Sequence, residues 1–348
     1  MPELDMSKLA ALVRRATRGD SNLAVEPMPG GASTRKYFRV RSGDRAMVAM
    51  FVPEGGKPEE IGKHHVEERW PFLEVRELLE SRGIDVPRVY GEDTPAGWLL
   101  LEDLGDDTLA NYLLREPEQK RAIYTRAVTD LARAQRALDP LPVESIVRTR
   151  AFDEDLLRWE IDHFREWGLE ARGHVLTTED RNTFDAIAAR LATRIAGWPK
   201  GFVHRDYQSR NLMVREGGAL AWIDFQDALL GPRIYDMVAL LNDSYQTFDR
   251  AFVEERLSEY AESTGMSQAE KDALGVEFDL MTVQRKLKDA GRFVFIDRVK
   301  GNSAFLKFVV PTVAKVASSL ARLRDVDPDM AALEALLIRL LPHEMTAI

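Results

Sequence analysis

Three polar residues in the middle of the chain have the types and the spacing that phosphoryl transfer from a nucleotide requires. Asp206 lies in the run F-V-H-R-D-Y-Q-S-R-N-L-M-V, four residues separate it from Asn211, and twelve more separate Asn211 from Asp224. Such a transfer needs one carboxylate near the acceptor hydroxyl, and a carboxylate and an amide oxygen that hold Mg²⁺ against the phosphates. The stretch 202–225, interpreted as strand–loop–strand, therefore predicts the active centre of a kinase.

The three residues divide the chemistry between them. Asp206 is the predicted catalytic base, which orients the acceptor hydroxyl and accepts its proton. Asn211 and Asp224 offer a carbonyl oxygen and a carboxylate, which are hard ligands suited to Mg²⁺. Taken singly, each residue is explained more simply by a surface turn or the end of a strand. Together, and framed by two apolar strands, they favour the catalytic interpretation.

Three further residues are expected to support this loop. His204 follows an apolar strand, where a lone histidine is commonly a buried hydrogen-bonding group, so we assign it and Arg205 a structural role. Asp236, in R-I-Y-D-M-V-A-L-L, lies near the start of a predicted helix. Its carboxylate interacts with the helix dipole, or accepts hydrogen bonds from the loop backbone, and the two roles are compatible.

The hydrophobic pattern predicts two lobes around this centre. Residues 1–102 read as β-strands with one main helix near 59–82, and are expected to form a nucleotide-binding lobe. Residues 103–348 are expected to form a mostly helical catalytic and substrate-binding lobe. Its predicted helices span 107–115, 117–138, 152–167, 179–196, 234–246, 249–264, 268–290, 303–324 and 329–341, with capping signals at Thr177-x-x-Asp180 and Ser267-x-x-Glu270. The predicted fold class is α+β, a small β-rich lobe followed by a larger helical one.

One candidate surface for the acceptor is the segment 152–167. It combines carboxylates with tryptophan, as sugar-binding sites do, and its candidate substrate residues are Glu160 and Glu166. A half-buried helix has the same pattern, so this alternative stays open. Arg210 and Asp227, next to the predicted metal ligands, are further substrate candidates.

A second candidate surface is the segment 284–300. Arg285 and Lys288 lie there on the far side of a helix from an apolar stripe. The default interpretation is a solvated basic face. The functional alternative is that these cations meet a carboxylate of the substrate.

The composition excludes several classes of partner and site. The chain has 348 residues, 45% of them hydrophobic and 30% charged, with a net charge of −9. An acidic protein has no global field that favours nucleic acid or an anionic membrane. There is no cysteine, no signal peptide at the N-terminus, and no apolar run near the ~18 residues of a membrane span. We therefore expect a cytoplasmic protein without nucleic-acid or membrane partners; its oligomeric state is not indicated.

Several runs of residues resemble a known family. H-R-D-Y-Q-S-R-N-L-M, I-D-F-Q-D and G-P-R-I-Y-D-M-V-A-L-L together resemble the aminoglycoside phosphotransferase-like group of the protein-kinase-like fold. With the later Q-R-K-L-K-D-A-G-R-F, they look closest to the anomeric sugar kinases of cell-wall recycling, which phosphorylate N-acetylmuramate or N-acetylglucosamine at C1 with ATP and Mg²⁺. The resemblance covers about 30–306. It implies a bilobal fold, Asp206 as base, Asn211 and Asp224 as metal ligands, and Asp236 as support of the loop.

The predicted nucleotide site departs from this family. The family's fold usually has a lysine on its third strand, whereas residues 46–52 read A-M-V-A-M-F-V. A Gly-Gly turn with hydroxyl neighbours could lie over phosphates instead, and nearby cations could replace the lysine. The candidate nucleotide-binding residues come from this turn, from the following strand and from the junction of the lobes: Gly30, Gly31, Ser33, Thr34, Lys36, Arg39, Glu102 and Leu104, with Lys57 as a further substitute for the lysine.

The spacing after Asp224 bears on the acceptor. Only eleven residues separate it from Asp236, too few for an activation segment that docks a protein substrate. We therefore expect an ATP- and Mg²⁺-dependent kinase of a small hydroxyl compound, an amino sugar at its anomeric hydroxyl. The alternatives are a phosphotransferase of aminoglycosides or other small alcohols and, because the strand lysine is missing, a catalytically silent nucleotide-binding scaffold.

Overall fold

The computed structural model describes residues 4–19, 22–29, 34–53 and 69–346. The chain forms two compact units. The first comprises Met1–Asp107 and Met213–Ile223, and the second comprises Thr108–Leu212 and Asp224–Ile348. The chain therefore passes between the two units three times, because the short segment Met213–Ile223 is an excursion from the second unit into the first.

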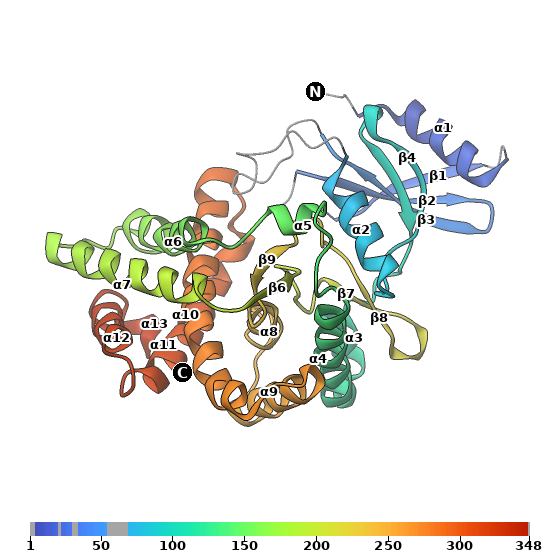
Figure 1. Cartoon of the computed structure of the whole chain (residues 1–348). Coiled ribbons are helices and arrows are strands. Elements are labelled where there is room, and N and C mark those ends of the chain that lie inside the picture. Colours follow the sequence, from blue (N-terminus) through green and yellow to red (C-terminus); the bar gives the residue numbers. More distant parts are fainter. Residues whose placement is uncertain (1–3, 20–21, 30–33, 54–68, 347–348) are drawn as a thin grey trace. The chain divides into compact units, whose positions relative to one another are not determined.

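The first unit is built on one antiparallel sheet of five strands (Figure 1). The spatial order is β1-β2-β3-β5-β4, so the last strand in the sequence lies inside the sheet. Strand Trp98–Glu102, inside the sheet, has buried residues on both faces, whereas strand Leu23–Pro27, at its edge, has only half-buried and exposed residues. The bounds are β1 (Leu23–Pro27), β2 (Lys36–Ser42), β3 (Arg45–Phe51), β4 (Val89–Asp93) and β5 (Trp98–Glu102).

Helix α1 (Met6–Thr17) covers one face of this sheet. Its buried residues recur at helical spacing and pack on the side chains that β2, β3 and β5 present to the same face. The resulting core contains Leu9, Leu12, Val13, Val40, Met47, Ala49, Phe51, Trp98 and Leu100. Asp5 caps the helix by accepting a hydrogen bond from the Ser7 amide at 2.8 Å.

The remaining parts of the first unit are α2 (Pro71–Ser81) and a hairpin. Strands β7 (Leu212–Val214) and β8 (Leu220–Trp222) form the hairpin, and its turn contains Gly217 and Gly218, both with positive φ. At its base, Arg215 makes paired contacts of 2.6–3.1 Å with the carboxylates of Asp85 and Glu102. These two-pronged ion pairs attach the hairpin to the first unit.

The second unit is mostly helical. Its helices are α3 (Leu109–Arg115), α4 (Lys120–Ala137), α5 (Ile146–Thr149), α6 (Glu154–His163), α7 (Thr178–Ala196), α8 (Tyr235–Leu241), α9 (Arg250–Thr264), α10 (Gln268–Lys300), α11 (Val309–Leu323), α12 (Pro328–Leu340) and α13 (Pro342–Met345). Both predicted capping boxes are confirmed, at the starts of α7 and α10.

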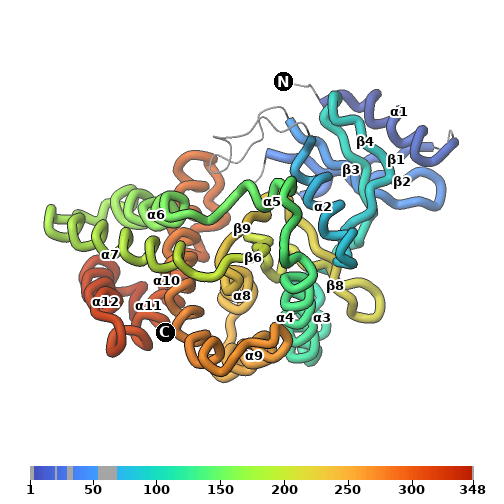
Figure 2. Tube along the Cα trace, in the orientation of Figure 1, coloured from blue at the N-terminus to red at the C-terminus, as the bar shows by residue number. Residues whose placement is uncertain are grey.

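Helix α10 is the central element of this unit. It has 33 residues, and it packs against α6, α8 and α11 (Figure 2, orange). It also contacts η3 (Phe164–Leu169), a π-helical turn that continues α6. The approach there is close, because a Cβ atom on Gly291 would lie 2.7 Å from the carbonyl oxygen of His163. Glycine is therefore required where α10 crosses the turn.

The strand pairing around 202–225 differs from the predicted strand–loop–strand. The stretch contains three strands of two sheets. β6 (Lys200–Val203) pairs antiparallel with β9 (Leu229–Pro232), whereas β7 pairs with β8. β9 lies beyond the predicted centre, so its pairing is a long-range contact that a local pattern does not reveal.

One stretch in the described part of the chain, Ser303–Leu323, is long and apolar enough by composition to cross a membrane. It comprises the 3₁₀ segment η6 (Ser303–Phe308) and α11. Helix α11 packs against α10 along a buried stripe that includes Val309, Val313, Val316 and Leu320. This stripe is the pattern of a core helix in a globular unit.

Candidate active site

Asp236 of α8 holds the backbone of the loop that joins β6 to β7, residues 204–211. The two carboxylate oxygens of Asp236 accept hydrogen bonds from the backbone N–H groups of His204 at 2.7 Å and Arg205 at 3.0 Å. Asp236 is fully buried. A carboxylate that binds two consecutive amides fixes the course of the backbone at this point.

Opposing effects act on the pKa of the Asp236 carboxyl. Burial raises the pKa of its carboxyl to about 7, while the amides of His204 and Arg205 and the nearby charge of Arg285 oppose that rise. Burial disfavours the charged form of a carboxyl, whereas hydrogen bonds to it and a nearby cation favour that form.

His204 and Arg205 both lie inside the unit. The Nδ1 atom of His204 accepts a hydrogen bond from the Asp206 amide at 3.3 Å. Arg205 has a φ of 77°, a left-handed conformation that is uncommon for a residue with a side chain. Its guanidinium pairs with the buried carboxylate of Glu160 at 3.3 Å. Both side chains therefore face the interior, and the turn they make directs the next residue outward.

Asp206 keeps 35% of its side chain exposed, so a substrate hydroxyl can reach it. Its backbone carbonyl accepts a hydrogen bond from the Nδ2 atom of Asn211 at 2.8 Å. Its carboxylate lies 3.4 Å from the Nη2 atom of Arg285. The predicted base thus belongs to a rigid loop but remains accessible.

Asp243, just after α8, is a supporting residue that sequence reasoning missed. It is fully buried and accepts hydrogen bonds from the backbone amide of Ser209, at 2.9 Å, and from its hydroxyl group. Lys315 of α11 donates to the backbone carbonyl of Asp243. Asp243 follows Asp236 by seven residues, so the only sequence signal was a second carboxylate after the same apolar run.

The predicted metal ligands are Asn211 and Asp224, both in the second unit. Because Asn211 donates its amide nitrogen to the Asp206 carbonyl, its side-chain oxygen is the atom left to bind a cation. Asp224 has a φ of 62° and accepts a hydrogen bond from Gln226 at 2.9 Å. Strained backbone of this kind concentrates at functional sites. An amide oxygen and a carboxylate fit Mg²⁺, which is commonly held by few protein ligands together with substrate phosphates.

Among the described residues, no group of three or more His, Cys, Asp or Glu side chains could hold a metal ion by itself. The site therefore offers no complete protein cage.

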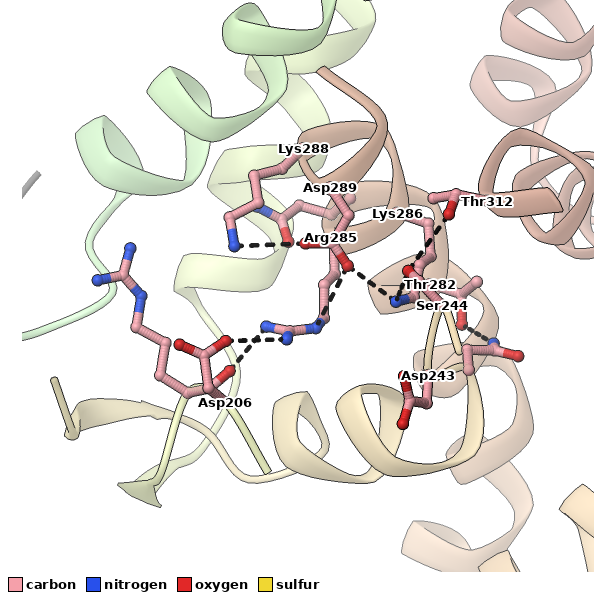
Figure 3. A network of polar contacts seen from close by, with 12 residues as sticks. Asp206, Asp243, Ser244, Thr282, Arg285, Lys286, Lys288, Asp289 and Thr312 are labelled. Carbon is pink, nitrogen blue, oxygen red and sulfur yellow. Dashed lines mark hydrogen bonds and ion pairs between the residues drawn. The ribbon is translucent and has the colours of Figure 1, made fainter. Parts of the chain in front are cut away.

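The predicted solvated basic face on 284–300 is wrong. Arg285 and Lys286 are fully buried, and the side chain of Lys288 is only 11% exposed. All three surround Asp289, whose carboxylate accepts hydrogen bonds from Lys286 at 2.8 Å and Lys288 at 3.4 Å (Figure 3). Burial works against the charge of Asp289, but the three cations hold its pKa below the usual range. The physical reason is that α10 is surrounded by other helices, so its charges are neutralised internally rather than by solvent.

The other substrate candidates have different surroundings. Glu160 is fully buried and bonded to Arg205 and, at 2.8 Å, to Gln284, so its carboxylate is directed to the protein rather than to an acceptor. Glu166 is exposed on the π-helical turn. Arg210 is exposed, and its guanidinium lies 3.5 Å from the ring centre of Tyr245.

The remaining substrate candidate, Asp227, lies in the turn that carries Asp224. It is half-buried and accepts a hydrogen bond from Gln226 at 3.2 Å. The same amide of Gln226 binds Asp224, so the structure brings these two carboxylates together.

Candidates for the nucleotide lie in the first unit. Gly30, Gly31, Ser33 and Lys57 lie outside the described residues, whereas Thr34 and Lys36 are exposed and Leu104 is half-buried. Arg39 is engaged by two carboxylates, with Asp103 at 2.8 Å and Asp106 at 2.8 Å. Glu102 is engaged by Arg215 at 2.8 Å. Arg39 and Glu102 therefore already have ionic partners within the unit.

The fold and this arrangement of residues belong to a known class. The phosphotransferase enzyme family matches residues 24–271, and the chain is a member of it. The chain is similar to the N-acetylmuramate/N-acetylglucosamine kinase of Pseudomonas aeruginosa, with 32% identity over 324 residues that cover 90% of this chain and 88% of that protein. The kinase of the same name from Neisseria meningitidis is 30% identical over 321 residues, covering 90% and 89%.

Solved structures share the fold at low identity. The choline kinase LicA of Streptococcus pneumoniae has a TM-score of 0.61 and 16% identity, covering 90% of this chain and 99% of that one. The gentamicin complex of APH(2")-IIa has a TM-score of 0.59 and 13% identity, covering 95% and 99%. The predicted protein-kinase-like bilobal fold is confirmed. The chain is therefore a phosphotransferase that phosphorylates an alcohol group.

Proposed function

We propose that this kinase uses ATP and Mg²⁺ to phosphorylate the anomeric hydroxyl of N-acetylmuramate and N-acetylglucosamine. The observation that carries the proposal is the 204–211 loop, which presents an accessible Asp206 with Asn211 bonded to its carbonyl. The similarity to kinases of these two sugars over nine-tenths of the chain supports the choice of acceptor. A cytoplasmic role in the recycling of cell-wall sugars follows from that choice.

The reaction uses the loop in a simple way. The acceptor oxygen attacks the γ-phosphorus of ATP, the new O–P bond forms, and the bond to the ADP oxygen breaks. Asp206 orients the hydroxyl and accepts its proton. Asn211 and Asp224 would hold Mg²⁺, which neutralises charge on the phosphates when bound. The amide contacts of Asp236 keep the backbone that carries Asp206 in a fixed geometry.

Arg210 is the best candidate for contact with an acidic substituent of the acceptor. It lies on the same loop, and in the part of the chain that the structure describes no carboxylate forms an ion pair with its guanidinium. Stacking on Tyr245 pre-orients the guanidinium, which binds carboxylates well. N-acetylmuramate carries a carboxylate on its lactyl group, and N-acetylglucosamine lacks it. Arg210 would therefore distinguish the two sugars.

The test measures phosphate transfer to a panel of acceptors by wild type and Asp206→Asn. The panel contains N-acetylmuramate, N-acetylglucosamine, choline and an aminoglycoside. We expect wild type to phosphorylate the two amino sugars, and Asp206→Asn to lose ~10²–10⁴-fold in kcat, the usual contribution of a general base. Turnover of the aminoglycoside alone would establish the other phosphotransferase activity. ATP binding without turnover of any acceptor would show that the protein is a catalytically silent nucleotide-binding scaffold.

One variant in the same assay tests the acceptor contact. Arg210→Gln should lower kcat/KM for N-acetylmuramate about tenfold, because a charged hydrogen bond contributes roughly 1.5–3 kcal/mol. A tenfold change corresponds to ~1.4 kcal/mol, close to the lower end of that range. The value of kcat/KM for N-acetylglucosamine should stay within about twofold, because this sugar has no carboxylate for Arg210 to bind. Equal losses for the two sugars would contradict a role in selectivity.

A further inference from the structure

Arg285 is a buried cation whose contacts converge on the predicted base. Its side chain is 0% exposed, although it lies in the middle of a 33-residue helix. A buried guanidinium needs hydrogen-bond acceptors and negative charge close by, because it has left its hydration shell. The identity of those acceptors therefore indicates what the residue is there to do.

Two of its contacts are made to consecutive residues of the 204–211 loop. The Nη1 atom donates a hydrogen bond to the backbone carbonyl of Arg205 at 2.8 Å. The Nη2 atom donates to the Oδ1 atom of Asp206 at 3.4 Å (Figure 3). The planar guanidinium fixes the spacing of these two donors, so it ties the orientation of the carboxylate to the backbone before it.

Other contacts hold Arg285 itself in place. Its Nε atom lies 4.0 Å from the carboxylate of Asp289, one turn further along α10. The guanidinium carbon lies 4.5 Å from the ring centre of Tyr235, which stands next to Asp236 in α8. Asp289 is in turn held by Lys286 and Lys288. The side chain is therefore held by groups that lie outside the 204–211 loop.

The same loop is fixed at three points, by a residue of α8, by a residue that follows α8 and by a residue of α10. Asp236 binds its first two amides, Asp243 binds the amide and hydroxyl of Ser209, and Arg285 binds the carbonyl between these anchors. Of these three residues, only Arg285 also contacts the carboxylate of Asp206.

We propose that Arg285 is a positioning residue of the kinase, which sets the direction of the Asp206 carboxylate toward the acceptor hydroxyl. The proposal rests on the proposed function of Asp206 as the base. It assigns Arg285 a contact with the base instead of the contact with a substrate carboxylate that the sequence suggested. It predicts that changes at Arg285 affect the chemical step and leave the binding of both substrates intact.

Arg256 offers a matched control for a buried arginine. It is also 0% exposed, pairs with Glu259 at 2.6 Å and Glu255 at 2.7 Å, and lies 4.9 Å from the ring centre of Phe252. It belongs to α9 and takes part in none of the loop contacts described above. Arg256→Lys therefore reproduces the loss of a buried, stacked guanidinium without a change at the base.

The experiment compares kcat and KM of Arg285→Lys, Arg256→Lys and wild type, with the acceptor that wild type phosphorylates best. Each protein is first checked by thermal unfolding and assayed well below its transition. For Arg285→Lys we expect kcat to fall ~10–100-fold, as small misplacement of a reacting group does, while both KM values stay within about twofold. Arg256→Lys should lose thermal stability but keep kcat within about twofold of wild type, since its group is remote from the reacting atoms.

A double-mutant cycle tests whether Arg285 acts through Asp206. In the Asp206→Asn background, Arg285→Lys should lower kcat by less than about twofold, because residues that act as a unit are not additive. An equal fall in both backgrounds, or unchanged kcat in Arg285→Lys, would overturn the proposal. A rise in the acceptor KM alone would overturn it in favour of a substrate contact. An inactive wild type would instead refute the proposed function.

Discussion

The carboxylates around the 204–211 loop differ in their exposure to solvent. Asp206 keeps 35% of its side chain exposed, whereas Asp236 and Asp243 are fully buried and bind backbone amides. Water and substrate therefore reach only the residue that is proposed to take a proton. The carboxylate oxygens of Asp236 and Asp243 accept hydrogen bonds from the loop backbone instead. Substitution of either residue would therefore change the conformation of the loop without removing a contact with substrate.

The raised pKa of Asp236, about 7, makes the stability of the protein depend on pH. In the unfolded chain an aspartate titrates near ~3.9, so folding takes up a proton between these two values. The contribution of this carboxyl to stability is therefore fully present below about pH 4 and is lost as the pH rises through about 7.

Asp236→Asn tests this linkage. The variant presents a donor to one of the two amides and leaves it unpaired, which costs about 1–3 kcal/mol. The melting temperature of wild type should exceed that of the variant most at about pH 4, and the difference should shrink as the pH rises toward about 8. Thermal unfolding at four pH values measures it. A difference that stays constant or grows over this range would contradict the raised pKa of this carboxyl.

At the level of elements, glycine makes possible the close crossing of α10 over the turn η3. A Cβ atom at position 291 would lie 2.7 Å from the carbonyl oxygen of His163 and 2.9 Å from the Cα atom of Phe164. Both are backbone atoms, so the two elements would have to separate.

Gly291→Ala should therefore destabilise the protein by about 1–3 kcal/mol, the usual effect of overpacking. Gly275→Ala is a control in the same helix, because its Cβ atom would meet only the end of Arg250 at 3.7 Å. This second change should stabilise α10 by up to ~1 kcal/mol through its higher helix propensity. Denaturant unfolding of both variants measures the two effects. A Gly291→Ala protein as stable as wild type would contradict the close crossing.

Local signals predicted local features well. The capping boxes at Thr177 and Ser267 involve four neighbouring residues each, and both are present. The predicted end of the helix at 290 precedes Gly291, a residue typical of helix ends. In the structure α10 continues to Lys300. Gly291 does not end the helix there; it allows α10 to pack closely against η3.

Long-range contacts were not predictable in this way. Ser209 and Asp243 are 34 residues apart, and Gln284 and Glu160 are 124 apart. The sequence pattern predicted Arg285 to be a cation on a solvated face. Its contact with Asp206 could not be predicted, because the two residues are 79 positions apart in the sequence. Asp236 could be identified from the sequence as a support of the loop, but the contacts of Asp243 and Arg285 with the loop could not.

At the scale of the whole molecule, binding of nucleotide and metal should raise the stability of the folded state. A ligand that binds only the folded protein stabilises it by roughly 2.7 kcal/mol at a hundred times its Kd. The melting temperature should therefore rise with a non-hydrolysable ATP analogue, and rise further when Mg²⁺ is added.

Asp224→Ala should abolish both the Mg²⁺-dependent part of this shift and Mg²⁺-dependent turnover. Asp227→Ala is the matched control, since Asp227 lies in the same turn and binds the same amide of Gln226 at 3.2 Å. It should keep the Mg²⁺-dependent shift in melting temperature. If Asp224→Ala kept the shift and a near wild-type rate, its assignment as a metal ligand would be refuted.

The excursion of Met213–Ile223 has a consequence for how the chain can be divided. A single cut between the two units leaves them covalently joined, since the backbone crosses between them at three places. A fragment that ends at Asp107 lacks the hairpin, and with it the guanidinium that pairs with Asp85 and Glu102. The first unit is therefore not a contiguous stretch of the gene product, and Asn211 and Asp224 lie at the two ends of its inserted piece.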